Sequence, residues 1–266
     1  MKPKKNENGA PASAGTASAG TDAAGKPSAA AVICAAGRSS RMGGIKKEYR
    51  RLPGRDITVL GAAVSAFAAV PGIQTIVIAV PAGHQSGEAR NALPQRFLSG
   101  ENGPAVRFVT GAETRRASVF NALSFLSGGS PPDIVLIHDG ARPWLSPSLV
   151  ERVIAGAGKY GAVIPLVPLA DTPKETDLPL DSPGGAPVFV KRHLRRAFTG
   201  AAQTPQGFAF PRILAAHEKA AMELERGECS DEFTDDAEVW AAFFGPVAVI
   251  PGEIENKKIT FPGDLL

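Results

Sequence analysis

Short apolar runs alternate with amphipathic segments along most of the chain, and this alternation limits the fold more than any other feature. The runs are rich in β-branched residues, nearly free of polar ones, and lie at 30–35, 74–80, 106–109, 134–137, 162–167 and 247–250. Such runs are typical of strands buried on both faces. Segments with helical patterns lie between several of them, at 58–69, 118–126, 147–159 and 212–226. The alternation predicts an α/β fold with a doubly wound, mostly parallel, Rossmann-like sheet.

The first 28 residues have a different composition from the rest of the chain. They consist largely of Ala, Gly, Ser, Thr and Pro, with no aromatic or branched aliphatic side chain. Because such a segment buries too little apolar surface to repay the entropy of ordering, we expect a disordered tail at 1–28 and one folded domain at 29–266. The lysines near the start are followed by polar residues and proline, and the tail has no arginine. Neither a signal peptide nor a transit peptide is indicated, so we expect a cytoplasmic protein.

Composition and charge exclude several classes of protein. Of the 266 residues, 44% are hydrophobic, and the formal net charge is only +3. A chain of this kind can bury a real core, and its overall charge demands no nucleic-acid partner. No apolar run approaches the roughly 20 residues that span a bilayer, so we expect no membrane partner. Cys34 and Cys229 are far apart and form no metal-binding motif or disulfide framework.

The segment 171–196 interrupts the alternation. It contains several prolines, a Gly-Gly turn and the alternating stretch VFVKR. This pattern predicts a protruding hairpin or arm. A floppy surface loop is the alternative, because long insertions cost little free energy.

The residues that follow the predicted strands indicate where a ligand binds, since ligands of open α/β sheets lie outside the carboxyl ends of the strands. Small residues, arginines, hydroxyls and an acid follow four strands, at 35–41, 110–118, 138–143 and 168–174. We expect these four strand ends to lie side by side along one edge. Asp139 ends an otherwise apolar strand, where an unpaired carboxylate is costly, so it is a candidate ligand for Mg²⁺. Alternatively, it caps the next helix or pairs with Arg142.

A nucleoside triphosphate would match this edge. Ala35, Ala36 and Gly37 are small enough to let a ligand approach backbone N–H groups, which attract phosphate oxygens. Arg41 and Lys47 would neutralise charge on the phosphates. The spacing is not that of a Walker A loop, and Ser39 replaces the second glycine of a dinucleotide fingerprint. The sequence also has no G-x-S-x-G elbow of a serine hydrolase, and its four histidines show no paired spacing for zinc.

The motifs of the chain resemble those of nucleotidyltransferases, and in particular of the 2-C-methyl-D-erythritol 4-phosphate cytidylyltransferase family. AAGRSSRM and KKEY resemble A-A-G-x-G-x-R-M and P-K-Q-[YF], and GAETRRASVFNAL resembles G-G-x-x-R-x-x-S-V-x-x-G-L. IHDGARP resembles V-H-D-A-A-R-P, PLADTPK resembles P-V-x-D-T-[IM]-K, and AAQTPQGF resembles A-Q-T-P-Q-x-F. FTDDA resembles [IY]-T-D-[ED]-A, and NKKITFPGDL resembles N-x-K-[IV]-T-x-P-x-D-L. The match covers about 31–266.

The resemblance implies transfer of CMP from CTP to a methylerythritol phosphate, with release of pyrophosphate, in the non-mevalonate route to isoprenoids. Arg41, Lys47 and Lys258 would bind the triphosphate and stabilise the reacting phosphorus, and Asp139 would bind Mg²⁺. The residues implied for CTP are Ala35, Ala36, Gly37, Gly111, Ala112, Glu113, Ser118 and Gly140. Those implied for the sugar-alcohol phosphate are Thr172, Arg196, Thr204 and Thr260. The segment 171–196 would be a dimerisation arm that reaches the active site of the other copy of a homodimer.

The chain departs from the family pattern at several of these motifs. Ser39 stands where the family has glycine, and Lys46 and Glu48 stand where it has proline and glutamine. Lys46 therefore competes with Lys47 for the catalytic role, and we favour Lys47 because it precedes the aromatic Tyr49 at the family spacing. Arg195 similarly competes with Arg196.

Other functions remain open at this stage. The closest is a ribitol-5-phosphate cytidylyltransferase or another sugar-phosphate nucleotidyltransferase, since only the acceptor pocket would differ. An NAD(P)-binding reductase and a non-catalytic nucleotide-binding regulator are more distant alternatives. Some family members carry a fused cyclodiphosphate synthase domain, and we expect none within these 266 residues, because the last motif ends with them.

Overall fold

The computed structural model describes residues 27–39, 42–44, 46–85, 87–100, 103–180, 187–228 and 233–265. Most of the predicted tail, together with Arg41 and Cys229, lies outside these residues. Ser28 belongs to the folded body, because its backbone N–H and its hydroxyl donate hydrogen bonds of 2.8 and 2.9 Å to the carboxylate of Asp133. The division into a disordered tail and a single domain stays a prediction.

The main sheet is mostly parallel, as the sequence predicts. Its strands are β1 (Ala29–Cys34), β2 (Ile73–Val80), β3 (Ala105–Thr110), β4 (Ile134–Asp139), β5 (Ala162–Pro168), β8 (Gly200–Ala202), β9 (Gln206–Ala209) and β10 (Ala248–Pro251). Their order is β10-β5-β9-β4-β1-β2-β3, and β8 pairs with β5. The parallel pairs are β1 with β2, β1 with β4, β2 with β3 and β5 with β10, whereas β8 and β9 run antiparallel to their partners.

Strand β9 was not expected from the sequence, because its proline- and glycine-containing surroundings are typical of a loop. Position 207 of this strand requires glycine, because a Cβ atom there would lie 2.5 Å from Cγ1 of Val153. The absence of a side chain therefore lets β9 pass directly beneath a covering helix. The consequence for the site is that β9 separates β4 from β5.

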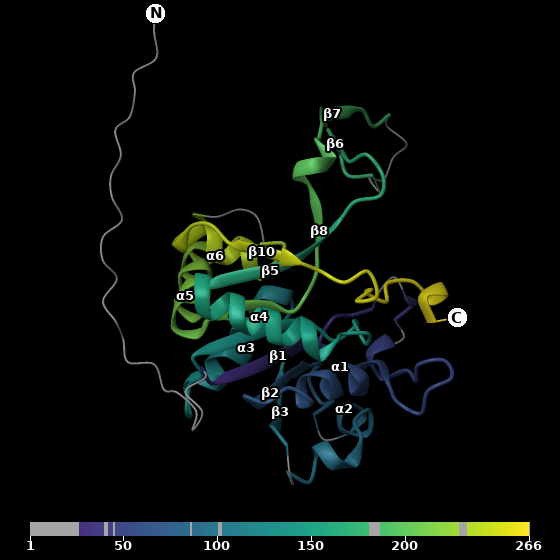
Figure 1. Cartoon of the computed structure of the whole chain (residues 1–266), viewed down its shortest axis with the longest axis vertical. Helices are drawn as coiled ribbons and strands as arrows, with labels where there is room; N and C mark the ends of the chain where they lie inside the picture. The colour runs from purple at the N-terminus through teal and green to yellow at the C-terminus, as the bar shows by residue number, and fades with distance from the viewer. Residues whose placement is uncertain are drawn as a thin grey trace, which may run out of the picture.

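Helices cover both faces of the sheet (Figure 1). They are α1 (Val59–Ala68), α2 (Glu88–Asn91), α3 (Arg115–Ser127), α4 (Pro147–Tyr160), α5 (Phe210–Glu225) and α6 (Asp236–Phe244), with 3-10 turns η2 (Lys47–Tyr49), η3 (Gln95–Phe97), η4 (Arg196–Phe198) and η5 (Pro262–Leu265). Hydroxyl groups of Thr58, Thr114 and Ser146 accept backbone N–H groups at the starts of α1, α3 and α4. Ser146 is the N-cap of α4 and Pro147 lies in its first turn, a combination that favours a helix start.

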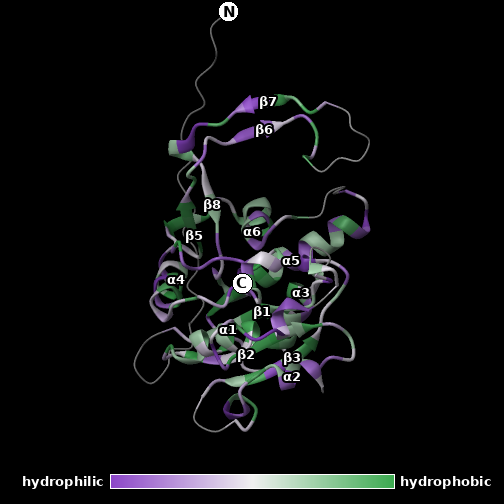
Figure 2. Cartoon of the chain, turned by 90° about the vertical axis from the view of Figure 1, so that its right-hand side faces the viewer, coloured by the Kyte–Doolittle hydropathy of each residue, from purple (hydrophilic) through white to green (hydrophobic). Residues whose placement is uncertain are grey.

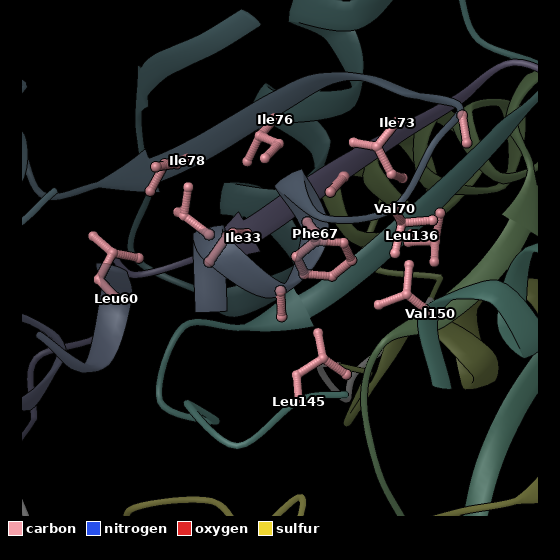
Figure 3. Packing of buried hydrophobic residues seen from close by; sticks show 14 of the residues in the cluster. Ile33, Leu60, Phe67, Val70, Ile73, Ile76, Ile78, Leu136, Leu145 and Val150 are labelled. Carbon is pink, nitrogen blue, oxygen red and sulfur yellow. The ribbon is translucent and has the colours of Figure 1, made fainter. Parts of the chain in front are cut away.

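Alternating side chains of the central strand divide the core into two layers. Ile33 of β1 packs with α1 and α4 on one face, while Val32 packs with α3, α5 and α6 on the other. Figure 3 shows Phe67 of α1 in the first layer, among Ile33 and Leu136. Apolar contacts on both faces thus fix the strands whose carboxyl ends carry the polar loops.

The predicted arm contains a hairpin that projects from the body (Figures 1 and 2). Strands β6 (Lys174–Thr176) and β7 (Val190–His193) pair antiparallel in a two-stranded sheet of their own. Residues 181–186 of the predicted arm lie outside the described residues. None of the helices in the described ranges combines the length and the apolar character that a membrane span requires.

Candidate active site

Three of the four predicted strand-end loops meet at one cleft of about 280 Å³. These are the loops after β1, β3 and β4, joined by the segment that follows β10. The cleft is lined by Cys34, Ala36, Gly37, Arg38, Ser39, Met42, Lys47, Glu48, Ala112, Glu113, Thr114, Arg115, Ser118, Asp139, Ala141, Lys258 and Thr260. The expectation that all four loops lie side by side is wrong for the loop after β5: none of its residues lines this cleft, β9 separates β5 from β4, and the chain after β5 leads into the arm.

The loop after β1 presents its backbone to the cleft. Ala36 and Gly37 line it, and a Cβ atom on Gly37 would meet no atom within 4 Å, so space for a ligand lies next to this backbone. Ala35, by contrast, is buried, and its N–H donates a 2.8 Å hydrogen bond to the carbonyl of Ala79. Of the three small residues, Ala35 therefore anchors the loop to the sheet.

The loop after β3 is tied tightly to its own helix and to the first loop. A Cβ atom on Gly111 would lie 2.2 Å from Cβ of Ala36, so any side chain there would push the two loops apart. The hydroxyl of Ser118 accepts a 2.9 Å hydrogen bond from the N–H of Ala112 and donates one of 2.9 Å to the carbonyl of Thr114. Backbone groups of this loop are consequently held in fixed positions along one wall of the cleft.

Asp139, the last residue of β4, lies at the centre of a cationic cluster. Its carboxylate is 3.0 Å from Nζ of Lys258, 3.6 Å from Nε of Arg115 and 3.4 Å from Nε of Arg142. Burial alone would raise the pKa of Asp139, but these three cations hold it well below its usual range. The carboxylate is therefore ionised at any physiological pH. Both sequence alternatives for Asp139 remain compatible with this geometry, since it pairs with Arg142 and still lines the cleft.

The donor set around Asp139 matches one kind of magnesium site. Within the described residues, no group of three or more His, Cys, Asp or Glu side chains is placed to hold a metal ion. Mg²⁺, however, is commonly bound by one or two carboxylates together with phosphate oxygens of a substrate. A single ionised carboxylate in a nucleotide-sized cleft fits that arrangement, and it does not fit an all-protein cage.

The two adjacent lysines of the KKEY motif point to different places. Lys47 lines the cleft, and its Nζ donates a 2.7 Å hydrogen bond to the carbonyl of Ile259, next to Lys258. Nζ of Lys46 instead donates to the carbonyls of Ala35 and Gly37, at 2.9 and 2.6 Å. The geometry favours Lys47 over Lys46 as the residue that meets a ligand. Arg41 lies outside the described residues, and its role stays a prediction.

The residues expected to bind the second substrate are dispersed in this chain. Thr260 lines the cleft. Thr172 and Arg196 are exposed at the base of the arm, where Nη1 of Arg196 donates a 2.7 Å hydrogen bond to the carbonyl of Ala170. Thr204 is buried beneath Asp139, and its hydroxyl accepts the N–H of Asp139 at 3.1 Å. Only Thr260 of these four therefore faces the cleft in this structure. Gly140, expected to bind CTP, is held against β1 by a 2.9 Å hydrogen bond from its N–H to the carbonyl of Cys34.

Several buried polar residues that support the cleft had no role in the sequence-based prediction. Arg115 connects Asp139 to the buried Asp236, whose Oδ2 is 2.7 Å from Nη1 of the arginine. Asn256 donates a 2.8 Å hydrogen bond from Nδ2 to the carbonyl of Thr204 and so anchors the segment that carries Lys258. Arg115 lies in the T-R-R stretch and Asp236 in the T-D-D-A stretch, and both stretches belong to the family motifs. The sequence does not show that the two side chains meet, and the fold does.

Comparison with known proteins agrees with this architecture. The family described as 2-C-methyl-D-erythritol 4-phosphate cytidylyltransferase matches residues 29–266. A curated protein of that name from Pelotomaculum thermopropionicum is 35% identical over 239 residues, covering 89% of this chain and 90% of its own length. The bifunctional enzyme IspD/IspF of a Bradyrhizobium species is 38% identical over 240 residues, and the chain spans about half, 54%, of that relative.

Solved structures give the same result. A 4-diphosphocytidyl-2C-methyl-D-erythritol synthase from Anaerococcus prevotii superimposes with a TM-score of 0.71 at 27% identity, covering 90% of this chain and 93% of its own. A 2-C-methyl-D-erythritol 4-phosphate cytidylyltransferase from Thermus thermophilus has a TM-score of 0.62 at 31% identity, with coverages of 88% and 94%. The sequence motifs, the fold and these comparisons agree, and the chain belongs to the 2-C-methyl-D-erythritol 4-phosphate cytidylyltransferase family.

Proposed function

We propose that this chain transfers the cytidylyl group of CTP to 2-C-methyl-D-erythritol 4-phosphate, giving 4-diphosphocytidyl-2-C-methyl-D-erythritol and pyrophosphate in the non-mevalonate isoprenoid pathway. One observation carries the proposal beyond family membership. Lys47, Asp139 and Lys258 come from distant parts of the sequence and line the same cleft as the small-residue loop after β1. Charged groups so placed serve a polyphosphate, not an apolar ligand.

The chemistry requires positioning and charge neutralisation. A phosphate oxygen of the acceptor forms a bond to the α-phosphorus of CTP, and the bond from that phosphorus to the oxygen bridging to the β-phosphorus breaks, so that pyrophosphate leaves with the bonding pair. The attacking oxygen is already ionised at neutral pH, so the step needs no general base. Lys47 and Lys258 stabilise the negative charge that develops around the reacting phosphorus. Arg41 has the same role by its motif.

We propose that the nucleoside half of CTP packs against the loop after β3. Gly111 and Ala112 form the part of the wall that selects a pyrimidine; because their N–H groups are already bonded to Val80 and Ser118, their carbonyl oxygens are the groups that meet the base, and Glu113 borders the same wall. Ala36 and Gly37 face the phosphates with their N–H groups. Gly140 keeps the loop after β4 close enough to β1 to complete the wall.

Asp139 is the residue that would hold Mg²⁺, together with oxygens of the triphosphate. The ion supplies further positive charge at the phosphates when it is bound. Lys258 and Arg115 already compensate the carboxylate, so the protein alone offers the cation little attraction. The triphosphate is therefore an essential part of the proposed metal site.

The acceptor site is proposed to be completed by a second copy of the chain. Thr172 and Arg196 lie at the base of the arm, away from the cleft that contains Thr260, and Thr204 is buried beneath it. The hairpin carries the exposed apolar side chains of Leu178, Leu180, Phe189 and Val190, and Phe198 of η4 is exposed at its base. Figure 2 shows hydrophobic stretches beside its hydrophilic strands. An apolar arm of this kind is suited to packing on a second copy, so we propose a homodimer.

A panel of acceptors tests the proposed reaction. The full chain is incubated with CTP, Mg²⁺ and either 2-C-methyl-D-erythritol 4-phosphate or ribitol 5-phosphate, and pyrophosphate and the nucleotide product are measured. We expect product from the first acceptor, and a preference for ribitol 5-phosphate would assign the sister activity instead. UTP and GTP in place of CTP check the base selectivity. Light scattering during size-exclusion chromatography tests the dimer. The cytoplasmic location stays a prediction from the sequence.

A further inference from the structure

Three departures from the family motifs meet at one point beneath the loop after β1. Ser39, Lys46 and Glu48 replace the glycine, proline and glutamine of the family pattern. Nζ of Lys46 lies 3.9 Å from Oε2 of Glu48, and the hydroxyl of Ser39 donates a long hydrogen bond of 3.5 Å to the same oxygen. We call these three residues the loop brace. Three separate changes that contact one another point to a shared role.

Lys46 uses its three N–H donors within this brace. Two donate to the carbonyls of Ala35 and Gly37, and the ammonium faces Glu48 on the remaining side. Burial lowers the pKa of Lys46, and the charge of Glu48 opposes that shift. Glu48 is itself only 4% exposed, so its carboxylate depends on the lysine for compensation.

The two carbonyl contacts fix the orientation of two peptide groups. In a trans peptide the C=O and N–H bonds point in opposite directions. With the carbonyls of Ala35 and Gly37 turned toward Lys46, the N–H groups of Ala36 and Arg38 are turned to the other side of the loop. Ala36 and Arg38 line the cleft.

The backbone conformation at Ser39 requires stabilising contacts. Its φ of 51° lies in the left-handed region, which serine adopts only at a cost and which glycine adopts freely. The carbonyl of Ser39 accepts hydrogen bonds from the N–H groups of Met42 and Gly44, and its hydroxyl reaches Glu48. These contacts offset the backbone cost that the replaced glycine would avoid.

We propose that Lys46 is a positioning residue for CTP: supported by Glu48 and Ser39, its ammonium orients the N–H groups of Ala36 and Arg38 toward the triphosphate before the nucleotide binds. This inference rests on the proposed CTP site. It separates the two lysines of the KKEY motif, because Lys47 meets the substrate and Lys46 shapes the loop.

Nucleotide binding and steady-state kinetics test the proposal on the full chain. In Lys46→Met we expect the Kd for CTP with Mg²⁺, and the KM for CTP, to rise about tenfold while kcat stays within about threefold, since the lost interaction acts on binding. In Lys46→Arg, which retains charge and donors, we expect KM to return to within about threefold of wild type. Lys159→Met makes the same substitution at an exposed site remote from the cleft and serves as the control.

A second variant separates positioning from folding. Lys46→Met leaves Glu48 buried without its cation, so its Tm should fall. In Lys46→Met/Glu48→Gln, an uncharged amide replaces the carboxylate. The Tm should therefore return toward that of wild type, while the KM for CTP stays high. A KM within twofold of wild type in a folded Lys46→Met protein would overturn the positioning role alone. A wild-type chain that does not bind CTP would overturn the proposed function, and this inference with it.

Discussion

Arg115 donates a 2.7 Å hydrogen bond from Nη1 to the buried carboxylate of Asp236, and this contact joins the first residue of α3 to the first residue of α6. The same guanidinium places its Nε 3.6 Å from the carboxylate of Asp139. Nε2 of the buried His217 lies 3.2 Å from the other oxygen of Asp236. A line of polar contacts thus runs from the helices on one face of the sheet to the cleft.

Neutralising Asp236 should damage the fold more than the loss of one hydrogen bond would. Asp236→Asn leaves an uncharged amide beside Arg115, which is 29% exposed and keeps Asp139 as a partner, so the loss should be about 2–3 kcal/mol, less than for a fully buried ion pair. We expect the free energy of unfolding to fall by an amount of that order, measured by urea denaturation at pH 7. The exposed carboxylate of Glu151 provides the control, because Glu151→Gln should change stability by less than about 0.5 kcal/mol.

Removing the charge of Lys258 should slow the chemical step. Lys258→Met removes a cation that we propose to lie beside the reacting phosphorus, while Asp139 keeps Arg115 and Arg142 as partners. We expect kcat to fall roughly 10²–10³-fold, as for other groups that stabilise charge in a transition state. The Tm should change little. The measurement is the rate of pyrophosphate release at saturating CTP and acceptor.

The adjacent lysine makes a matched control for Lys258. Lys257 is exposed one position earlier in the same segment, so Lys257→Met carries the same substitution without removing a group from the cleft. Its kcat should stay within about twofold of wild type. Equal losses in the two variants would show that general positive potential, not the position of Lys258, is what matters.

The sequence predicts the sheet and the cleft to different degrees. Runs such as 134–137 in β4 are apolar on both faces, so their composition and length indicate buried parallel strands. Strand β9 was missed because its glycine is required by the packing of Val153, a contact that no local pattern encodes. Helix α6 was also missed, although its N-cap Asp235 and its acidic first turn are local signals of a helix start.

The motif residues that line the cleft could be located from the sequence because they directly follow predicted strands. Gly111 and Ala36 illustrate this, since their loops touch at the ends of β3 and β1, although β2 lies between these two strands. Motif spacing favours Lys47 over Lys46, but the sequence does not show where either side chain points. Which of two adjacent lysines points down into the loop depends on the backbone of η2 and on the carbonyl of Ile259, contributed from the far end of the chain.

Acid should weaken the fold through His138. Burial lowers the pKa of this residue from 6.5 to about 4, and its ring nitrogens contact the carbonyl of Arg142 and the hydroxyl of Thr204. The unfolded chain therefore binds a proton at a higher pH than the folded one, and stability contributed by the neutral ring is complete above pH 6.5 and lost as the pH falls toward 4. A shift of this size is equivalent to about 3 kcal/mol.

Urea denaturation across this pH range isolates the contribution of His138. Between pH 7.5 and 4, wild type should lose about 3 kcal/mol more than His138→Gln, whose side chain does not titrate. Carboxylates elsewhere affect both proteins equally, so the difference between the two curves is the informative quantity. Parallel curves for the two proteins would show that His138 is not the group responsible.

Cys34 should be a slow nucleophile although it borders the cleft. Burial raises the pKa of its thiol to about 12, an effect that the nearby Arg115 only partly opposes. At pH 8 the thiolate population is then far below that of an ordinary cysteine, and the greater intrinsic reactivity of a more basic thiolate recovers only part of the rate. We expect iodoacetamide to modify Cys34 on the order of fiftyfold more slowly than a free thiol. Peptide mass spectrometry distinguishes it from Cys229, and urea-denatured protein should react at the ordinary rate. Rapid labelling of the native chain would mean that the thiol is ionised in the cleft.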